Sequence, residues 1–295
     1  MNVVIIMNGL LLINKEKDMT SRDVVNIACR HLKTKKIGHT GTLDPNATGV
    51  LVLCIGNALK IVDLITSYNK TYVGEVILGI NTDTLDITGN ILNRCENTDI
   101  TKEKIENVLN SFLGKSMQEV PLYSAVKVDG KKLYEYARSN IPVVLPVKEI
   151  SINSIGLCSE IEYSDVIKFS IMCDVSKGTY IRSLIRDIGV KLNTCACMGD
   201  LVRVRQGIYE LNDCVTLDDV KEGNYKLISM NDALSCYEKI VVSDELEKKV
   251  RNGMVLPRFF SDNICVIMDK NDDVIGIYES YEKDNTMVKP RNIFN

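Results

Sequence analysis

Runs and alternations of apolar residues divide the chain into short strands and amphipathic helices. The uninterrupted apolar runs at residues 10–13 and 50–55 are typical of buried strands. Apolar residues alternate with others at residues 72–80 and again from Phe169 to Val175, which predicts strands that turn one face inward. Residues 81–90 are polar and contain Asp83, Asp86 and Gly89, so we predict a loop there.

Four segments have the spacing and the end signals of helices. Thr20 and Ser21 offer an N-cap to a helix that runs through Leu32, with an apolar face on every fourth residue. Thr101 caps a second helix, which Gly114 is expected to close. A third helix is predicted from Leu133 onward and a fourth over residues 181–192. Strands and helices in this mixture indicate an α/β protein of the α+β type with a mixed sheet.

The character of the chain changes at about Val241. Ser243 can cap a short helix that Asn252 and Gly253 end. The apolar runs 264–268 and 274–278 flank a polar turn, which predicts a β-hairpin, and residues 288–294 are expected to form a closing strand. With 295 residues, the chain is long enough for one large domain followed by a smaller, β-rich one.

Composition is that of an ordinary globular protein, with 45% hydrophobic and 25% charged residues. No apolar run approaches the length of a membrane span, and the apolar opening segment lacks the basic region of a signal peptide. Most of the ten cysteines stand singly in apolar strings, and the pair Cys195 and Cys197 is too closely spaced for a zinc knuckle. We therefore expect no metal and a reduced, cytoplasmic protein.

A net charge of −3 gives no overall basic footprint for nucleic acid. Local clusters change this picture, because a basic face can coexist with an acidic total. Each cluster alone is also compatible with an ordinary solvated face. The clusters are Arg30, Lys33, Lys35 and Lys36; Lys127, Lys131, Lys132 and Arg138; and Arg203 with Arg205.

The richest stretch for chemistry is residues 38–51, with the sequence GHTGTLDPNATGVL. Its three glycines and Pro45 exclude a regular helix, so Asp44 is predicted to lie in a constrained loop before a buried strand. A residue before proline is restricted to extended conformations, which limits where the Asp44 carboxylate can point. No Lys or Arg lies between His39 and Leu59, so any cation partner comes from elsewhere. On its own, this pattern also fits an aspartate that caps its own turn.

This stretch resembles the catalytic-aspartate motif of the TruB family of tRNA pseudouridine synthases. The resemblance extends from Gly9 to about Tyr209 and continues in four further strings in the family's order. These strings are KTY at 70–72, VPLYSAVK at 120–127, GKKLYEYAR at 130–138 and SKGTYIR at 176–182. The resemblance to the family begins near Asn8. We therefore expect the protein to start at Met7, with residues 1–6 as an extension.

The resemblance implies a pseudouridine synthase catalytic domain at about residues 8–231, followed by a small PUA-like RNA-binding domain at 240–295. It implies conversion of the T-loop uridine at position 55 of tRNA to pseudouridine, with the tRNA T-stem-loop as partner. Isomerisation consumes no redox equivalent and no nucleotide, so no cofactor is expected. We also expect a monomer that needs no protein partner and no membrane.

By resemblance, the catalytic residues are Asp44, which acts on the glycosidic carbon of the flipped base, and Arg182, which pairs with it. A carboxylate suits an electron-poor sugar carbon, either as a nucleophile or by assisting proton loss. A guanidinium fork keeps the carboxylate ionised and fixes its direction. Without the resemblance, Arg182 would be taken as a helix-surface charge.

Four further residues match substrate-binding positions of the family. Tyr72 would stack on the flipped uracil and Tyr180 would place its hydroxyl near the reacting groups. Leu201 would pack on the base and His39 would contact the T-loop RNA. Taken alone, an aromatic residue in a strand, such as Tyr72, is usually part of the core or the sheet surface, and Leu201 would be a core leucine. A histidine beside glycines would be a turn residue, but the chain has only two histidines, which favours a functional role for His39.

The chain departs from the family pattern at Glu16 in place of proline, at a single Pro121 in place of a double proline, and at Val202 in place of a cation. These departures concern RNA affinity and leave the catalytic residues in place. Two rival functions remain open at this stage. One is a non-catalytic tRNA-binding chaperone on the same scaffold, and the other is a hydrolase or phosphotransferase with Asp44 as nucleophile, which would need metal ligands.

Overall fold

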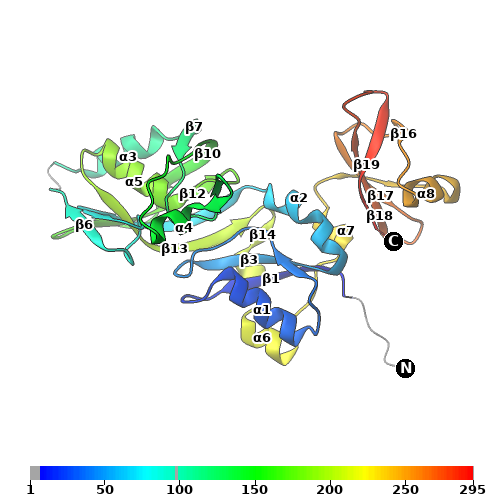
Figure 1. Ribbon diagram of the computed structural model, residues 1–295, viewed down its shortest axis with the longest axis horizontal. Helices are drawn as coiled ribbons and strands as arrows, with labels where there is room; N and C mark the ends of the chain where they lie inside the picture. Colours follow the sequence, from blue (N-terminus) through cyan, green and yellow to red (C-terminus); the bar gives the residue numbers. More distant parts are fainter. Residues whose placement is uncertain (1–6, 97–98, 295) are drawn as a thin grey trace.

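One large mixed sheet runs through most of the molecule in the computed structural model, which describes residues 7–96 and 99–294 (Figure 1). The expected extension, residues 1–6, lies outside the described residues. Neighbouring strands are antiparallel except for β3 and β13, which are parallel. In spatial order the main strands are β1 (Gly9–Lys15), β3 (Thr48–Ile55), β13 (Ala196–Gln206), β4 (Lys70–Leu78), β12 (Ile167–Val175), β10 (Val147–Leu157) and β7 (Gly114–Glu119). Three short strands extend it: β2 (Ile37–His39), β11 (Glu162–Tyr163) and β14 (Tyr209–Glu210).

Strands β1 and β3 are covered on both faces, which explains their uninterrupted apolar runs. Leu11 and Leu53 point to the face covered by α1 (Ser21–His31) and α6 (Leu217–Glu222). Leu10 and Val52 point to the opposite face, which is covered by a 3₁₀ segment at Gly56–Ile61 and by α2 (Val62–Thr66). Burial on both faces requires apolar side chains at consecutive positions. The predicted strands at 10–13 and 50–55 are confirmed.

The far half of the sheet is covered by α3 (Lys102–Asn110) and α5 (Ile181–Lys191), as Figure 1 shows. Strand β12 buries Phe169 and every second residue after it against these helices, which confirms the predicted alternation. Helix α5 buries Leu184 and Ile188 on the same side. The first residues of α5 are thereby fixed against a rigid sheet, and this is where Tyr180 and Arg182 lie.

A second, smaller sheet follows at one end of the large sheet (Figure 1), and apolar residues of the two sheets, such as Leu10 and Val266, belong to one hydrophobic cluster. The predicted hairpin and the predicted closing strand are confirmed as β17–β18 and β19. Ser243 caps α8 (Asp244–Arg251) as predicted. The sheet's strands are, in order, β15 (Glu238–Val241), β17 (Ile264–Met268), β18 (Val274–Ser280), β19 (Met287–Ile293) and β16 (Leu256–Pro257), and α7 (Met230–Ala233) precedes them.

Several predicted boundaries were wrong. The strand predicted at 72–80 begins at Lys70 and ends at Leu78, because Gly79 has a φ of +95° that breaks it. The polar loop predicted at 81–90 is shorter, since β5 (Ile80–Thr82) pairs with β6 (Ile91–Arg94). Helix α3 ends at Asn110, before Gly114, which opens strand β7 instead of closing the helix. The segment from Leu133 is α4 (Leu133–Arg138), which follows the short hairpin of β8 (Lys127–Val128) and β9 (Lys131–Lys132).

One expectation about the cysteines was also wrong. Cys95, just after β6, and Cys195, just before β13, form a disulfide with their Cα atoms 5.7 Å apart. Residues that lie 100 positions apart could not be paired from spacing alone. Cys29, Cys54 and Cys173 are free thiols as expected. In the part of the chain that the structure describes, no helix has the length and apolarity of a membrane span.

Candidate active site

The loop that carries Asp44 is held from several sides. Asp44 and Pro45 open a tight turn that closes with a hydrogen bond of 3.0 Å from the Ala47 amide to the Asp44 carbonyl. The Leu43 amide donates to the Ser21 hydroxyl at the start of α1 (2.9 Å). The buried Lys15 ammonium donates to the Pro45 carbonyl (3.1 Å). The loop therefore presents the Asp44 carboxylate from a fixed backbone.

Arg182, in the first turn of α5, contacts both oxygens of the Asp44 carboxylate with its guanidinium group. Its Nε lies 3.0 Å from one carboxylate oxygen of Asp44, and its Nη2 donates to the other at 3.1 Å. The remaining donors bind the carbonyls of Thr84 (3.1 Å) and Tyr123 (3.0 Å). The Arg182 side chain is 7% exposed, so it has one available orientation. Such a two-point contact aligns a carboxylate in a way that a lysine cannot reproduce.

Asp86 is a second carboxylate at the site, and the sequence analysis did not identify it as one. Its Oδ2 lies 3.8 Å from Nη1 of Arg182, so the guanidinium lies between two acidic side chains. Its other oxygen accepts hydrogen bonds from Thr84 and Thr88, which shape the tip of the β5–β6 hairpin. In the sequence, Asp86 lay in an acidic polar loop, for which turn formation was the better explanation.

The surroundings of Asp44 favour the protonated carboxyl group more than water does for an exposed aspartate. Burial raises the pKa of Asp44 above its usual 3.8, the nearby Arg182 guanidinium lowers this pKa, and Asp86 raises it again. The side chain is still 39% exposed, so a ligand can reach it from the cleft. A carboxylate with a raised pKa loses its charge at a higher pH than an exposed aspartate does.

Asp44 forms part of the wall of a cleft of about 360 Å³. Leu201 lines this cleft from β13, and Arg182 lines it from α5. The other lining residues are Pro45, Asn46, Ala47, Thr84, Asp86, Thr88, Tyr123, Tyr134, Arg138, Met198 and Gly199. The cleft thus combines apolar and aromatic walls with a few converging polar groups, as small-molecule and base-binding sites do.

Tyr72 and Tyr180 flank this arrangement without being among the lining residues of the cleft. Tyr72, on β4, is 7% exposed and packs in the same core as Leu43, Ala47 and Leu201. Tyr180 is the N-cap residue of α5 and is half-buried. Burial raises the pKa of Tyr180, against the smaller lowering effects of a hydrogen bond with Ser124 and of the Arg182 charge, so its phenol stays protonated at neutral pH.

His39 lies on β2, away from the residues that line the cleft. Its Nδ1 accepts from the Gly41 amide (3.4 Å), and it is half-buried. Burial lowers the pKa of His39, and Arg22 and Arg203 lower it further, so the imidazole is neutral at pH 7. The structure therefore gathers Asp44, Arg182 and Leu201 at one cleft, places the two tyrosines close to these residues and leaves His39 outside the lining of the cleft.

Only one residue of the third predicted basic cluster, Arg205, lies at the surface. Arg203 is 1% exposed and donates to the carbonyls of Val50 (2.7 Å) and Gly41 (3.1 Å). Arg205 pairs with Asp174 at 2.8 Å. The interpretation of this pair as a solvent-facing phosphate site was wrong for Arg203, because its guanidinium ties the Asp44 loop to β13.

Gly49 allows this close contact between the Asp44 loop and β13. A Cβ on Gly49, whose φ is +102°, would lie 2.3 Å from the Arg203 carbonyl oxygen. We expect Gly49→Ala to lower the free energy of unfolding by about 3 kcal/mol or more, measured by urea denaturation. Gly223→Ala is the control, since φ is also positive (+83°) but no atom lies within 4 Å, so only about 1 kcal/mol should be lost. Equal losses in the two variants would show that the contact with Arg203 is not the cause.

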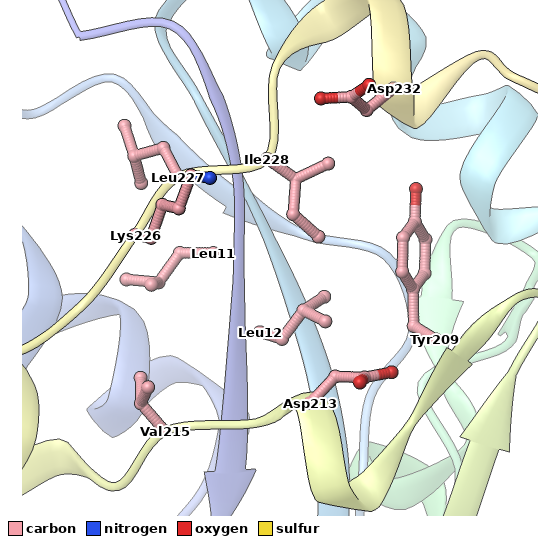
Figure 2. A pocket seen from close by; sticks show the side chains of 9 residues that line it. All are labelled: Leu11, Leu12, Tyr209, Asp213, Val215, Lys226, Leu227, Ile228 and Asp232. Atoms are coloured by element: carbon pink, nitrogen blue, oxygen red, sulfur yellow. The ribbon is translucent and has the colours of Figure 1, made fainter.

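A second hollow, of about 390 Å³, lies at the outer edge of the sheet (Figure 2). It opens between β1 and two segments that run beside it, residues 213–215 and 226–232, which form single β-bridges with β1 at Val215 and Ile228. It contains none of the predicted site residues. Its two carboxylates are engaged locally, since Asp213 accepts from the Glu210 amide (2.9 Å) and Asp232 from the Ser229 hydroxyl (2.8 Å). The cleft at Asp44 is therefore the better candidate for chemistry.

Comparison with known proteins points to the same cleft. Residues 29–181 match the family described as "TruB family pseudouridylate synthase (N terminal domain)", and residues 182–241 match "tRNA pseudouridylate synthase B C-terminal domain". The chain is 42% identical to tRNA pseudouridine synthase B of Bacillus cytotoxicus over 97% of both chains. It is 40% identical to the protein of the same name from Staphylococcus saprophyticus over 98% of this chain and 99% of that one.

Solved structures show the same fold at lower sequence identity. The chain resembles one in the "Crystal Structure of a Cbf5-Nop10-Gar1 Complex" with a TM-score of 0.72, at 23% identity, over 98% of this chain and 85% of that chain. A second match, in "Structure of H/ACA RNP bound to a substrate RNA containing 2'-deoxyuridine", has a TM-score of 0.71 at 21% identity, over 98% and 86% of the two chains. The expected fold, a mixed α/β sheet followed by a β-rich part, is confirmed.

Proposed function

Since this chain belongs to the TruB family of pseudouridylate synthases, we propose that it is an isomerase that converts uridine to pseudouridine in tRNA. Its target is the uridine at position 55 in the T-loop, and its partner is the tRNA T-stem-loop. It works in the cytoplasm as a monomer without a protein partner. Residues 8–231 form the catalytic domain, and residues 240–295 form a PUA-like RNA-binding domain. The comparisons give no support to a non-catalytic chaperone.

The observation that carries the assignment of the site is the two-point ion pair between Arg182 and Asp44 at the wall of the cleft. The reaction breaks the bond from C1′ to N1, turns the uracil over and joins C5 to C1′. The target base must first leave the RNA stack, so a pocket that receives it is required. Leu201 lines the cleft that receives the base, and Tyr72, which packs in the same core as Leu201, is the residue that stacks on the base by family resemblance. His39 contacts the T-loop at the margin.

Arg182 fixes the direction of the Asp44 carboxylate toward the base pocket and stabilises its charge. Asp44 acts at the sugar carbon, either by attack on C1′ or by assisting proton loss, and both routes require an ionised carboxylate. Tyr180 offers a neutral hydroxyl at the start of α5, where its backbone amide is held by the Gln118 side chain (2.8 Å). The proton on C5 leaves to solvent, and N1 gains a proton.

Release of the C5 hydrogen tests this function. A tRNA transcript made with 5-tritiated uridine should lose tritium to water in proportion to the enzyme added, while the base stays in the RNA. A hydrolase that uses Asp44 as nucleophile would release free uracil instead. A chaperone would bind the transcript and release neither. Either of these two results would overturn the assignment.

The pH dependence of the reaction rate should follow the protonation state of the Asp44 carboxylate. Because burial and Asp86 raise its pKa, the rate should be full above this raised pKa and fall as the pH drops through it. This acid limb should lie above the range of an ordinary aspartate. Asp86→Asn removes the charge that raises the pKa but keeps an oxygen acceptor for Thr84 and Thr88, so the limb should shift to lower pH in single-turnover measurements.

Asp83→Asn is the matched control for this shift. Asp83 lies in the same hairpin and holds Asn90 (2.8 Å), but it is not among the groups that shift the pKa of Asp44. Its acid limb should coincide with that of the wild type. A limb that is unchanged in Asp86→Asn, or shifted equally in both variants, would contradict the described charge balance.

A further inference from the structure

Residues 80–94, here called the active-site hairpin, bring two acceptors to Arg182. These are the Thr84 carbonyl (3.1 Å) and the Asp86 carboxylate (3.8 Å). The hairpin itself buries little surface, since all four residues of β6 are exposed and Leu92 is 63% exposed. Segments with few buried apolar contacts are the first to open in a folded protein. The position of the hairpin therefore depends on its attachments.

The hairpin is attached to β13 at its tip and at its base. At the tip, the Ile87 amide donates to the Met198 carbonyl (2.8 Å), and the Met198 amide donates to the Leu85 carbonyl (3.0 Å). At the base, the Gly79 amide donates to the Cys195 carbonyl (2.8 Å). The disulfide from Cys95 to Cys195 closes the base covalently, where β6 ends and β13 begins. Neither cysteine is fully buried.

We propose that the Cys95–Cys195 disulfide is a redox-controlled link that holds the active-site hairpin against β13 and thereby raises turnover. When the bond is closed, the hairpin keeps Thr84 and Asp86 against Arg182, which in turn keeps Asp44 aligned. When the bond is reduced, the hairpin keeps its hydrogen bonds to β13 and its contacts with Arg182 but loses the covalent link, and it opens more often. The effect on turnover rests on the proposed function, whereas the closing of the link does not.

The chemistry is thiol–disulfide exchange with a small disulfide such as oxidised glutathione. The thiolate of one cysteine attacks the small disulfide, and one thiol of the reagent leaves. The second cysteine then attacks the mixed disulfide, and the second reagent thiol leaves. The two protein thiols are oxidised, the small disulfide is reduced, and the two protons end on the two released thiols. Because both cysteines are partly accessible, a small reagent can reach them.

The full chain is incubated with oxidised glutathione or with dithiothreitol, and each form is analysed in three ways. Mass spectrometry after alkylation should find Cys95 and Cys195 joined only in the oxidised form. Hydrogen exchange at residues 80–94 should be slower by about tenfold or more in that form. Turnover on a tRNA transcript should be about threefold or more higher, since misplacement of groups at a site lowers rate steeply.

The double variant Cys95→Ser with Cys195→Ser should behave like the reduced form under both conditions. Cys158→Ser, which removes an exposed free thiol elsewhere, should respond to oxidation like the wild type. Failure of the two cysteines to join would overturn the proposal, and so would a joined form whose exchange and turnover equal those of the reduced form. If no form makes pseudouridine, the proposed function fails, and the mass and exchange results still decide whether the link operates.

Discussion

Asp44→Asn should abolish pseudouridine formation while leaving the RNA complex intact. The amide has almost the shape of the carboxylate, so the tight turn at Pro45 and the cleft should persist. It carries no charge and cannot act on C1′, so we expect turnover to fall by on the order of 10⁴-fold or more. Rates are measured by tritium release under single-turnover conditions, and RNA binding by filter retention. The dissociation constant should change by no more than about threefold.

The stability of Asp44→Asn should also stay close to that of the wild type. Burial raises the pKa of Asp44, which means that the ion pair with Arg182 does not fully offset the loss of water around the carboxylate. Asp86 still lies 3.8 Å from the Arg182 guanidinium and leaves it a counter-charge, so we expect the free energy of unfolding to change by less than about 2 kcal/mol. Asp218→Asn, on an exposed pair with Lys221, should change neither rate nor stability. Substantial turnover by Asp44→Asn would remove Asp44 from the chemistry.

Arg182→Lys should lower turnover by on the order of 10² to 10³-fold, although it keeps the positive charge. The guanidinium contacts both oxygens of Asp44 and the carbonyls of Thr84 and Tyr123 together. A lysine ammonium is a single point and cannot reach these acceptors at once. The carbonyls would lose partners in a buried place, and Asp44 would lose its fixed direction. Single-turnover rates at saturating RNA measure the effect on the chemical steps.

Arg186→Lys is the matched control on the same helix. Arg186 lies one turn further along α5 and forms partly buried pairs with Glu119 and Asp187, both at 2.8 Å. Arg186 is not among the residues that line the cleft, so this variant should keep its rate within about twofold. If Arg182→Lys and Arg186→Lys lowered the single-turnover rate equally, the two-point contact between Arg182 and Asp44 would have no special role in the reaction.

The sequence predicted correctly those helices and strands that short patterns of neighbouring residues determine. The apolar runs at 10–13 and 50–55, the alternation from Phe169 and the cap at Thr20 each became the element they indicated. Boundaries at glycines were harder, because glycine fits a helix end, a strand start or a bend equally well. Gly114 opens β7 and Gly79 ends β4, and only the tertiary structure decides between these roles.

Long-range contacts account for what the sequence could not predict at the site. The family resemblance proposed that Arg182 reaches Asp44, and the structure places them in contact across 138 positions of the chain. Asp86 lay in a polar loop with no sign that it would face the same guanidinium. The burial of Arg203 and the pairing of Cys95 with Cys195 depend on which strands become neighbours. Spacing along the chain carries no information about either.

Chemical mapping of pseudouridine on an unmodified tRNA transcript decides whether this protein modifies the T-loop uridine and whether Asp44 is required. After incubation with the wild-type protein, we expect one modified uridine, in the T-loop at position 55, and none after incubation with Asp44→Asn. If the transcript stays unmodified, or if the modification is confined to another part of the tRNA, the proposed function is wrong.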